Sequence, residues 1–540
     1  MKRAAALGLA SAMMVSLLAG CGGTSGKDST VAESGKESSQ VQASKETSGD
    51  SSESGNLESG AEDGKKAYID YDEDPYEVVI ELLNLGMNQD SVPEMEAAIN
   101  EITLPEINCT VKLQVIHIAD HATKTALWAA GGEKIDIYYV GTTVPFSQFV
   151  SDGMIIPITD VLEERGQTIL EKSGDLMKAF TVDGEIYAIP QNLYCATASG
   201  IDYNGDMFDE LDMELPQEWN MQTLTDIGYK LKEVNPDYYL MAKNGATDAT
   251  EMSIFYGMDN FGSGTGVYGT LMNPETDTQI QNMYTTEEFK EYCLYNIEWK
   301  ENGFMPADQA VSGENAQDLY RNGQTFCQWV GVTPLEAITK QGSMSFHNQQ
   351  AAFTNPRLTS SGVQEKAWGI SMNCERPDKA MDFLNLLYEN ADLANILNYG
   401  IEGKDYVYTE GSDRIISYPE GVDGTNVGWA RIFCIFGDSM DTAQMLPATE
   451  EFYSDLKAFN DKAVVCPTLG YTFDASNVAT EITAVTNVVQ EYVPSLVYGE
   501  VSEDELDAYL ADLNERLDKA GINDIIAENQ AQLDAWLASK

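Results

Sequence analysis

The sequence predicts an α/β protein with a parallel sheet, and the alternation of strand and helix patterns after residue 76 is the main observation behind this prediction. Residues 77–85, 109–118 and 134–140 are apolar-rich runs typical of strands. Helical patterns over 94–102 and 122–130 separate these runs. Strands that alternate with helices favour parallel pairing, because each helix returns the chain to the end of the sheet at which the previous strand began, so that the next strand runs in the same direction.

The rest of the chain continues as strands and helices without an internal repeat. Short extended segments are predicted at 184–192 and 199–204, helices at 222–234 and 286–300, and an apolar strand at 323–332.

Helices nearer the C-terminus have clear start and stop signals. Pro377 falls in the first turn of a helix whose apolar residues recur at helical spacing. Ser502 and Glu505 form a capping box that opens a helix over 503–519, which has one stripe of leucines and is stopped by Gly521. A last helix follows.

Length and charge exclude whole classes of function. The chain has 540 residues, of which 43% are apolar, as in a globular protein of about three to four domain-sized units. Its 87 Asp and Glu against 32 Lys and Arg leave a net charge of -55. Nucleic acids and anionic lipid surfaces are held by Lys and Arg, so neither is expected as a partner. Neutral or cationic small molecules remain open.

The N-terminus predicts the location of the protein. Residues 1–20 have the layout of a signal peptide, with two basic residues, an apolar run over 4–18 and small residues before Cys21. This ending looks like a bacterial lipobox, whose cysteine is acylated; an ordinary secretory peptide is the alternative. Residues 21–66, rich in Ser and Gly, predict a disordered tether with a reach of roughly 35 Å. The folded body is then expected at the outer face of the cell membrane, anchored by lipid.

The seven cysteines beyond Cys21 predict free, buried thiols. They are widely spaced, odd in number and contain no C-x-x-C pair, unlike a disulfide framework. A single disulfide stays open. The seven are Cys109, Cys195, Cys293, Cys327, Cys374, Cys434 and Cys466.

No motif of catalysis, metal binding or cofactor binding is found. His117 and His121 have the spacing of a metal pair but no H-E-x-x-H, so structural or surface roles are expected. Asp202-x-Asn204-x-Asp206 begins like a calcium loop, but Met207 occupies the glycine position of that motif. We therefore predict no catalytic residue, no metal and no cofactor. Counting cannot select or exclude the acid pair of a glycosidase in so acidic a chain.

Two tryptophans have positions that suit sugar binding. Trp329 lies near the end of an apolar strand, and Trp429 lies in the Gly-rich loop 423–429. Pyranose rings have apolar C–H faces that stack on Trp or Tyr. The alternative for each tryptophan is that its side chain is buried in the hydrophobic core. If they stack, Trp329→Ala or Trp429→Ala weakens sugar binding by at least about 1 kcal/mol.

Several stretches, in this order, resemble one known family. They are 134–141, 153–162, 201–211 with Pro216 and Trp219, 367–390 with 397–406, and 520–532. Together with the lipobox and tether they resemble the extracellular solute-binding lipoproteins of bacterial ABC importers, family 1 or carbohydrate type, in the subgroup with a C-terminal domain of uncharacterised role.

The resemblance implies two α/β lobes joined by a hinge, plus a helical C-terminal extension. Lobe 1 is expected at 67–188 and 325–378, and lobe 2 at 189–324 and 379–540 with the extension. The cleft closes on the ligand. The partner is then an ABC permease in the membrane with a separate ATPase, and the binding protein acts as a monomer.

Site residues are carried over by position. In open α/β sheets ligands lie beyond the carboxyl ends of strands, which here include Asn88 and Gln89. The resemblance adds Asn192 and Tyr194 at the crossover, and Trp329. The loop argument adds Trp429, and Asp136 is a strand-end residue with a lesser chance of bonding sugar hydroxyls.

The leading hypothesis is a binding protein, not an enzyme, that captures a carbohydrate, in particular an oligosaccharide, for import. Two alternatives stay open. One is an oligopeptide or amino-sugar binder, which acidic lobes favour. The other is a surface-anchored glycoside hydrolase, which needs two carboxylates about 5–9 Å apart.

Overall fold

The first sheet contains the three strands predicted near the start of the chain, in a computed structural model that describes residues 66–243, 250–307, 309, 315–341, 344–429 and 434–540. The signal peptide, Cys21 and the tether to residue 65 lie outside the described residues. In spatial order the strands are β2 (Cys109–His117), β1 (Tyr76–Asn84), β3 (Ile137–Val140), β12 (Ala367–Ile370) and β6 (Ala188–Pro190). The first three are parallel, as predicted, and β12 runs antiparallel to both of its neighbours.

Alternating side chains of this sheet fill two separate cores. Ile80 of β1 lies in the same cluster as Ile137 of β3, whereas Val79 and Tyr138 lie in the other. Successive side chains of a strand point to opposite faces, so a strand buried on both sides is apolar at nearly every position.

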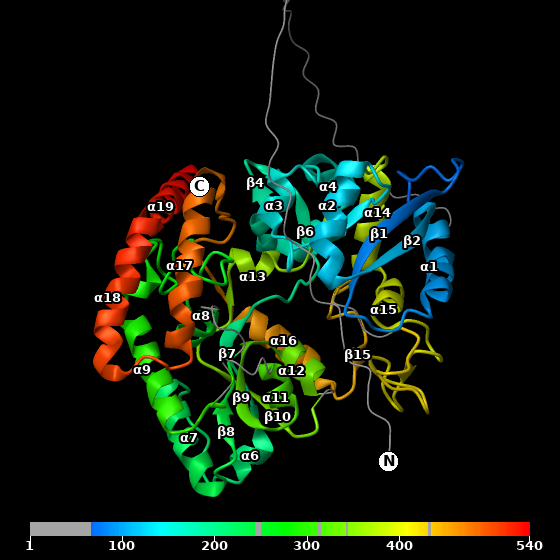
Figure 1. Cartoon of the computed structure of the whole chain (residues 1–540). Coiled ribbons are helices and arrows are strands. Elements are labelled where there is room, and N and C mark those ends of the chain that lie inside the picture. The colour runs from blue at the N-terminus through cyan, green and yellow to red at the C-terminus, as the bar shows by residue number, and fades with distance from the viewer. Residues whose placement is uncertain (1–65, 244–249, 308, 310–314, 342–343, 430–433) are drawn as a thin grey trace, which may run out of the picture. The chain divides into compact units, whose positions relative to one another are not determined.

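Helices cover both faces of the sheet (Figure 1). One face packs against α1 (Val92–Ile107), α4 (Thr159–Arg165), α5 (Gln167–Ser173), α14 (Pro377–Glu389) and α15 (Ala391–Tyr399). The other packs against α2 (His121–Gly131), α3 (Phe146–Ser151), the 3-10 helix η2 (Gly174–Phe180) and α13 (Ser360–Gln364). Short elements in the same part of the chain are η1 (Ile118–Asp120), β4 (Thr181–Val182) and β5 (Glu185–Ile186).

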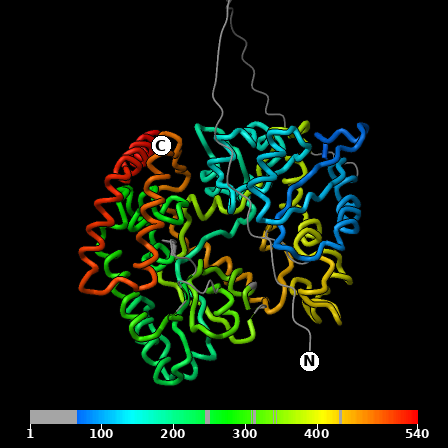
Figure 2. Tube along the Cα trace, viewed as in Figure 1, coloured from blue at the N-terminus to red at the C-terminus, as the bar shows by residue number. Residues whose placement is uncertain are grey.

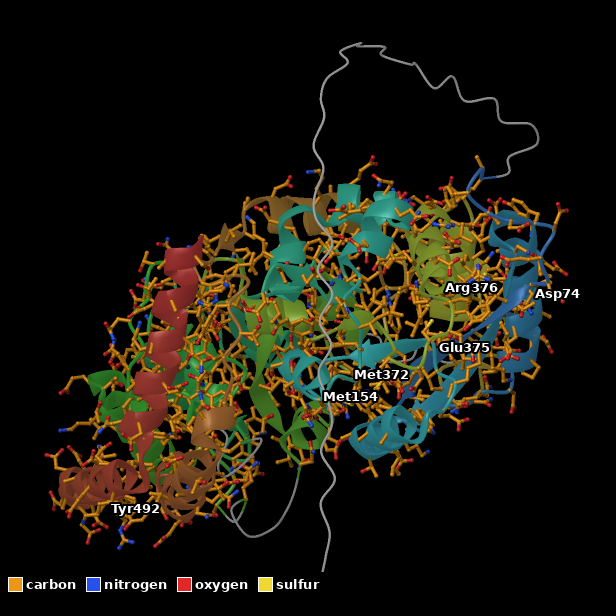
Figure 3. The ribbon with its side chains drawn as sticks, turned by 90° about the horizontal axis from the view of Figure 1, so that it is seen from above. Asp74, Met154, Met372, Glu375, Arg376 and Tyr492 are labelled. Atoms are coloured by element: carbon orange, nitrogen blue, oxygen red, sulfur yellow. The ribbon has the colours of Figure 1, made fainter. Side chains whose placement is uncertain are left out.

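The first sheet and the helices that cover it form the first lobe, and loops of this lobe are tied to the sheet. Beyond the end of β12, Met372 N donates a hydrogen bond of 3.0 Å to Met154 O, and the two residues lie close together in Figure 3. Arg376, labelled in the same view, precedes α14 and pairs with Glu73 at 3.0 Å and Asp378 at 2.8 Å. Ion pairs of this kind join the start of the folded chain to the first turn of α14.

A second sheet has the order β10 (Asn348–Ala352), β7 (Ala198–Asn204), β9 (Thr325–Val332) and β8 (Tyr239–Met241). Only the pair formed by β8 and β9 is parallel. The helices of this second lobe are α6 (Gly205–Asp209), α7 (Met221–Val234), α8 (Thr250–Tyr256), η3 (Met283–Thr285), α9 (Glu287–Glu301), α11 (Ala316–Arg321) and α12 (Pro334–Gln341). Trp299 Nε1 on α9 donates a 2.7 Å hydrogen bond to Thr225 Oγ1 on α7, which fixes the packing of these two helices.

The C-terminal helices pack against the second lobe and share its largest core (Figure 1). They are η4 (Ser476–Val478), α17 (Ala479–Val497), α18 (Glu503–Ala520) and α19 (Ile522–Ser539). The predicted capping box does not form: the Ser502 side chain makes no bond to a backbone N–H of α18, and its Oγ donates instead to Glu505 Oε2 at 2.8 Å. Gly521, at a φ of 102°, ends α18 as predicted, because this left-handed conformation disfavours residues with a Cβ.

A smaller group of elements follows α15. It comprises β13 (Val407–Tyr408), β14 (Ile415–Ser417), β15 (Gln444–Met445) and α16 (Glu451–Asp461), and the strand β16 (Val464–Val465), which pairs with β11 (Arg357–Leu358). The trace in Figure 2 places the yellow segment around residue 400 beside the blue N-terminal strands and α1, and α1 packs against α15.

Two segments belong to other lobes than expected. Strand β9, expected in lobe 1, pairs with β7 and β8 in the second sheet. Helices α14 and α15, of which most was expected in lobe 2, pack against the first sheet. Both segments are apolar enough to be buried in either place, so their partners depend on strand pairing and packing that the chain pattern does not specify.

All seven described cysteines are free, as predicted. Five of them are buried, and Cys195 and Cys374 are partly exposed. Within the part of the chain that the structure describes, none of the helices combines the length and apolar character needed to cross a bilayer.

Candidate functional site

A pocket of about 300 Å³ lies where the chain passes between the two sheets. This volume is at the lower end of the range for small-molecule sites. Its walls come from the segment between β6 and β7, the end of β9 with α12, α13 with the segment that follows it, and Ile435. The lining residues are Asn192, Tyr194, Cys195, Thr197, Gly331, Thr333, Leu335, Glu336, Lys340, Gly362, Val363, Glu365, Lys366 and Ile435.

The pocket adjoins a junction of three chain segments. Thr197, just before β7, forms a bridge with Arg357 of β11, and Arg357 is paired with Val464 of β16. Asn460 Oδ1 accepts a 3.0 Å hydrogen bond from Ala196 N. Two of these segments connect the first sheet with the second, so the pocket lies where the chain crosses between the sheets.

Asn192 and Tyr194, both predicted as site residues, line this pocket. The Asn192 amide accepts a 2.9 Å hydrogen bond from Tyr194 N and donates one of 3.1 Å to Tyr194 O, so it shapes the turn that presents the tyrosine. Burial raises the pKa of Tyr194 to about 12, with the nearby Asp438 carboxylate adding to the effect. The hydroxyl therefore stays protonated at neutral pH. None of the described residues forms a hydrogen bond with it, which leaves it available to a ligand.

Four charged side chains surround the pocket, two of each sign. Glu336 and Lys340 come from α12, and Glu365 and Lys366 from the segment before β12. Lys340 Nζ lies 3.1 Å from the buried carboxylate of Asp202 and 4.0 Å from Glu336. The formal charges of the lining residues balance although the chain carries -55. Such a lining offers hydrogen-bond donors and acceptors to a neutral polar ligand without favouring a net ligand charge.

The remaining polar groups of the pocket are two threonine hydroxyls and one thiol. Thr333 Oγ1 accepts a 3.1 Å hydrogen bond from Glu336 N at the start of α12, and Thr197 Oγ1 donates to Cys195 O at 3.3 Å. Burial raises the pKa of Cys195 to about 12. A thiol is nucleophilic as the thiolate, so this one is not activated for chemistry at neutral pH.

Asn88 and Gln89 lie elsewhere, in the exposed turn between β1 and α1. Asn88 Oδ1 accepts a 3.0 Å hydrogen bond from Asp90 N, and Gln89 O accepts one of 3.1 Å from Val92 N. The next residue, Ser91, donates its backbone N–H to Gly428 O at 2.9 Å. This turn is thereby joined to the loop that precedes Trp429, and not to the pocket.

Trp429 and Trp329 are both buried side chains outside the pocket lining. Trp429 is 1% exposed in the core of the first lobe, and its Nε1 donates a 3.0 Å hydrogen bond to Leu397 O. Trp329 is 5% exposed, its ring lies 4.9 Å from that of Phe255, and its Nε1 has no hydrogen-bond partner among the residues that the structure describes. In this structure neither indole presents a face to solvent.

Asp136 is fully buried at the start of β3. Its two carboxylate oxygens accept hydrogen bonds from Tyr76 Oη at 2.7 Å and Val79 N at 2.8 Å. This is the strand-end role expected from the sequence, and both oxygens are used by protein donors.

The histidine pair and the calcium-like segment are structural. His121 is buried, with Nε2 3.2 Å from Tyr139 O and 3.6 Å from Glu81, while His117 lies at the end of β2. Asp202 accepts hydrogen bonds from Gln328 at 3.0 Å and Gln350 at 2.9 Å. In the described residues no group of His, Cys, Asp and Glu side chains could hold a metal ion.

Sequence reasoning missed the charged residues and threonines of the pocket. Glu336, Lys340, Glu365 and Lys366 have no spacing that distinguishes them from surface charges. The one available signal was Gly331 near the end of an apolar strand: a Cβ there would lie 2.7 Å from Thr197 Cγ2, so glycine lets β9 approach the segment between β6 and β7 closely.

A family model described as "Bacterial extracellular solute-binding protein" matches residues 93–394, which is more than half of the chain. The chain belongs to this family of bacterial extracellular solute-binding proteins. It is accordingly a binding protein and not an enzyme. A second model, a domain of unknown function (DUF3502), matches residues 467–538, the region of α17 to α19.

Individual relatives of this solute-binding protein are distant but match most of its length. A protein of Streptococcus pneumoniae named carbohydrate ABC transporter substrate-binding protein is 24% identical over 497 residues, 90% of this chain and 94% of the relative. The crystal structure of an N-glycan transport solute binding protein from the same species is 23% identical, with a TM-score of 0.75 over 86% of this chain and 99% of that one. Its structure in complex with Man5GlcNAc gives a TM-score of 0.65.

A solute-binding protein from Bifidobacterium longum infantis, described as HMO binding and ABC-transporter associated, is 15% identical, with a TM-score of 0.59 over 86% of this chain and 100% of that one. These structural likenesses confirm the predicted α/β solute-binding fold.

Proposed function

We propose that this protein captures a neutral oligosaccharide between its two lobes and delivers it to an ABC permease. The observation that supports this best is the pocket at the lobe junction, whose lining combines Tyr194, two threonines, an amide and balanced charges. Sugar hydroxyls need both donors and acceptors, and a tyrosine ring offers an apolar face to the pyranose. The names of the S. pneumoniae and B. longum relatives support a carbohydrate as the ligand class.

The proposed delivery uses the same junction. Ligand contacts from both lobes favour the closed form, and a permease can distinguish the closed surface from the open one. Acylation at Cys21 and a tether over 21–66 would keep the body within roughly 35 Å of the membrane, where the permease lies.

The first experiment is a thermal-shift screen of the mature chain against neutral oligosaccharides, amino sugars and short peptides. A ligand at 100 times its Kd adds about 2.7 kcal/mol to the stability, which raises the unfolding temperature measurably. Man5GlcNAc belongs in the panel, because it is the ligand named for a related structure. Stabilisation by peptides alone would refute the carbohydrate proposal, and consumption of a bound sugar overnight would indicate a hydrolase.

Two variants then test the pocket. Tyr194→Phe removes only the hydroxyl and should weaken binding by about 0.5–1.5 kcal/mol, a factor of about 2–12. Tyr229→Phe, an exposed tyrosine on α7 whose hydroxyl bonds Glu298 at 2.8 Å, is the matched control and should leave the affinity unchanged.

Glu365→Gln discriminates between ligand classes. A neutral sugar can replace a carboxylate contact with an amide contact at little cost, whereas a cationic amino sugar or peptide loses a charge-assisted hydrogen bond of about 1.5–3 kcal/mol. Titration calorimetry of this variant therefore separates the proposed neutral ligand from both cationic alternatives.

A further inference from the structure

A seven-residue segment, 466–472, runs between the strand β16 at the lobe junction and the C-terminal helices. We call it the strap. It begins beside β11, where Cys466 N donates a 3.1 Å hydrogen bond to Leu358 O. The region matched by the model of unknown function begins within it, at residue 467.

One side of the strap belongs to the first lobe. Leu469 is 1% exposed and lies in the same core cluster as Phe180 of η2 and Val363 of α13. Gly470 has a φ of 98°, and a Cβ there would lie 2.7 Å from Lys178 O. Only glycine fits both that conformation and that close approach.

The other side of the strap belongs to the C-terminal helices and the second lobe. Tyr471 lies in the large second-lobe core, and its hydroxyl is 2.6 Å from Asn529 Oδ1 of α19. Lys540 Nζ donates hydrogen bonds of 3.3 Å to Pro467 O and Leu469 O. Leu469 and Tyr471, two residues apart, are therefore buried in the cores of different lobes.

Between these two attachments the strap holds α13. Ser360 Oγ donates to Thr468 O at 3.0 Å and accepts from Gly470 N at 2.9 Å. Gln364 Nε2 donates to Thr472 Oγ1 at 2.9 Å and to Ala179 O at 2.6 Å. Ser360 is buried, so both of its bonds replace contacts with water.

The held segment is a wall of the pocket. Gly362, Val363, Glu365 and Lys366 line it, and Ser360 and Gln364 are their neighbours in the chain. Motion of one lobe against the other displaces Leu469 relative to Tyr471, and the strap transmits this displacement to the pocket wall through Ser360 and Gln364.

We propose that the strap, with which the C-terminal region of unknown role begins, is a positioning element of the ligand site that sets the position of residues 362–366. That residues 362–366 bind a ligand rests on the proposed function, whereas the contacts between the strap and α13 do not depend on it. Leu469, Ser360 and Gln364 are positioning residues, since none of them needs to touch the ligand.

Hydrogen exchange in the ligand-free full chain tests the inference without any assumption about the ligand. Leu469→Ala should increase amide exchange over 360–366 by about tenfold or more, because this wall loses its packing. Leu517→Ala is the matched control: Leu517 is as buried as Leu469, but it lies in α18 and outside the core cluster that contains Leu469 and Val363 of α13. It should leave exchange over 360–366 as in the wild type.

Two further variants keep the test decisive. Ser360→Ala removes the hydroxyl that bonds the strap at two points, and should give the same pattern even if Leu469→Ala does not fold. Leu469→Ile, which retains the volume, should restore slow exchange. The inference would be overturned if either Ser360→Ala or Leu469→Ala showed the same amide exchange over 360–366 as the control Leu517→Ala.

Binding of Man5GlcNAc is the second readout. Affinity should fall about tenfold in Ser360→Ala and remain at the wild-type level in Leu517→Ala. If neither Man5GlcNAc nor another oligosaccharide binds the wild type, the proposed function fails, and the exchange result still decides whether the strap positions this wall. If the wild type binds and both variants bind equally well, the strap has no role in the site.

Discussion

Replacement of Trp429 by Phe should destabilise the first lobe through one hydrogen bond. The indole Nε1 of Trp429 donates to Leu397 O at 3.0 Å. Leu397 lies in the last turn of α15, whose final carbonyls have no partner inside the helix. Phenylalanine keeps an aromatic ring in the core but leaves this buried carbonyl without its indole donor.

The magnitude follows from comparison with a second tryptophan. Trp329→Phe makes the same chemical change at a similarly buried site, but the Nε1 of Trp329 has no partner to lose. Both variants lose comparable packing volume, and Trp429→Phe additionally leaves a buried acceptor unsatisfied, at about 1–3 kcal/mol. Trp429→Phe should therefore lower the free energy of unfolding by about 1–3 kcal/mol more than Trp329→Phe does.

Urea unfolding followed by circular dichroism at 222 nm measures both variants without using tryptophan emission. Equal losses in the two variants, or a larger loss in Trp329→Phe, would refute the reasoning from the hydrogen bond. Titration of Trp329→Ala and Trp429→Ala with oligosaccharides tests the stacking prediction made from the sequence, and unchanged affinity in both would remove that prediction. A loss of at least about 1 kcal/mol of binding energy in either one would support direct contact with the sugar.

Three other outcomes are expected. Burial raises the pKa of Asp382 to about 6, against the opposing charges of Arg165 and Lys379. Between about pH 4 and 6 the native state then holds a proton that the unfolded chain has released. The contribution of Asp382 to the free energy of unfolding is therefore full below pH 4 and is lost as the pH rises through 6. Asp382→Asn should remove about 2–3 kcal/mol of this pH dependence, measured by urea midpoints at pH 4 and 7, and an unchanged slope would contradict the assignment. Cys21→Ala should shift the protein from the membrane fraction to the medium, as judged by immunoblot, and retention in the membrane would exclude acylation as the anchor. Ellman's reagent should leave the five buried cysteines unmodified in the native chain and modify all seven described cysteines in denaturant without reductant, whereas a shortfall in denaturant would indicate a disulfide.

Local patterns predicted individual elements well. The run 77–85 is the strand β1 (Tyr76–Asn84), and the helix expected over 503–519 is α18 (Glu503–Ala520). Both follow from patterns within a few residues of chain: apolar residues at nearly every position of a strand buried on both faces, and a stripe of leucines ended by a glycine. Asn192 and Tyr194, carried over by position from the family resemblance, both line the pocket, and their contact with a ligand stays a prediction.

Patterns did not reveal which surfaces meet. Trp429 follows a Gly-rich loop that suggested exposure, yet Gly428 packs so closely on Ser91 and Asp405 that a Cβ there would clash, and the indole enters the core. Strand β9 is apolar throughout, which predicts burial but not the sheet it joins. Glu365 and Lys366 resemble any surface pair until α13 and the strap bring them to the pocket.

The sequence by itself determined the α/β class and the likeness to solute-binding proteins, because these depend on periodicity and on the order of motifs along the chain. Only the tertiary structure decided which segments share a lobe, that both candidate tryptophans are buried, and that four balanced charges surround one pocket. The physical reason is range. Periodicity and capping act over a few residues, whereas the bond from Ser360 to Thr468 joins positions 108 residues apart and forms only when folding brings the two segments together.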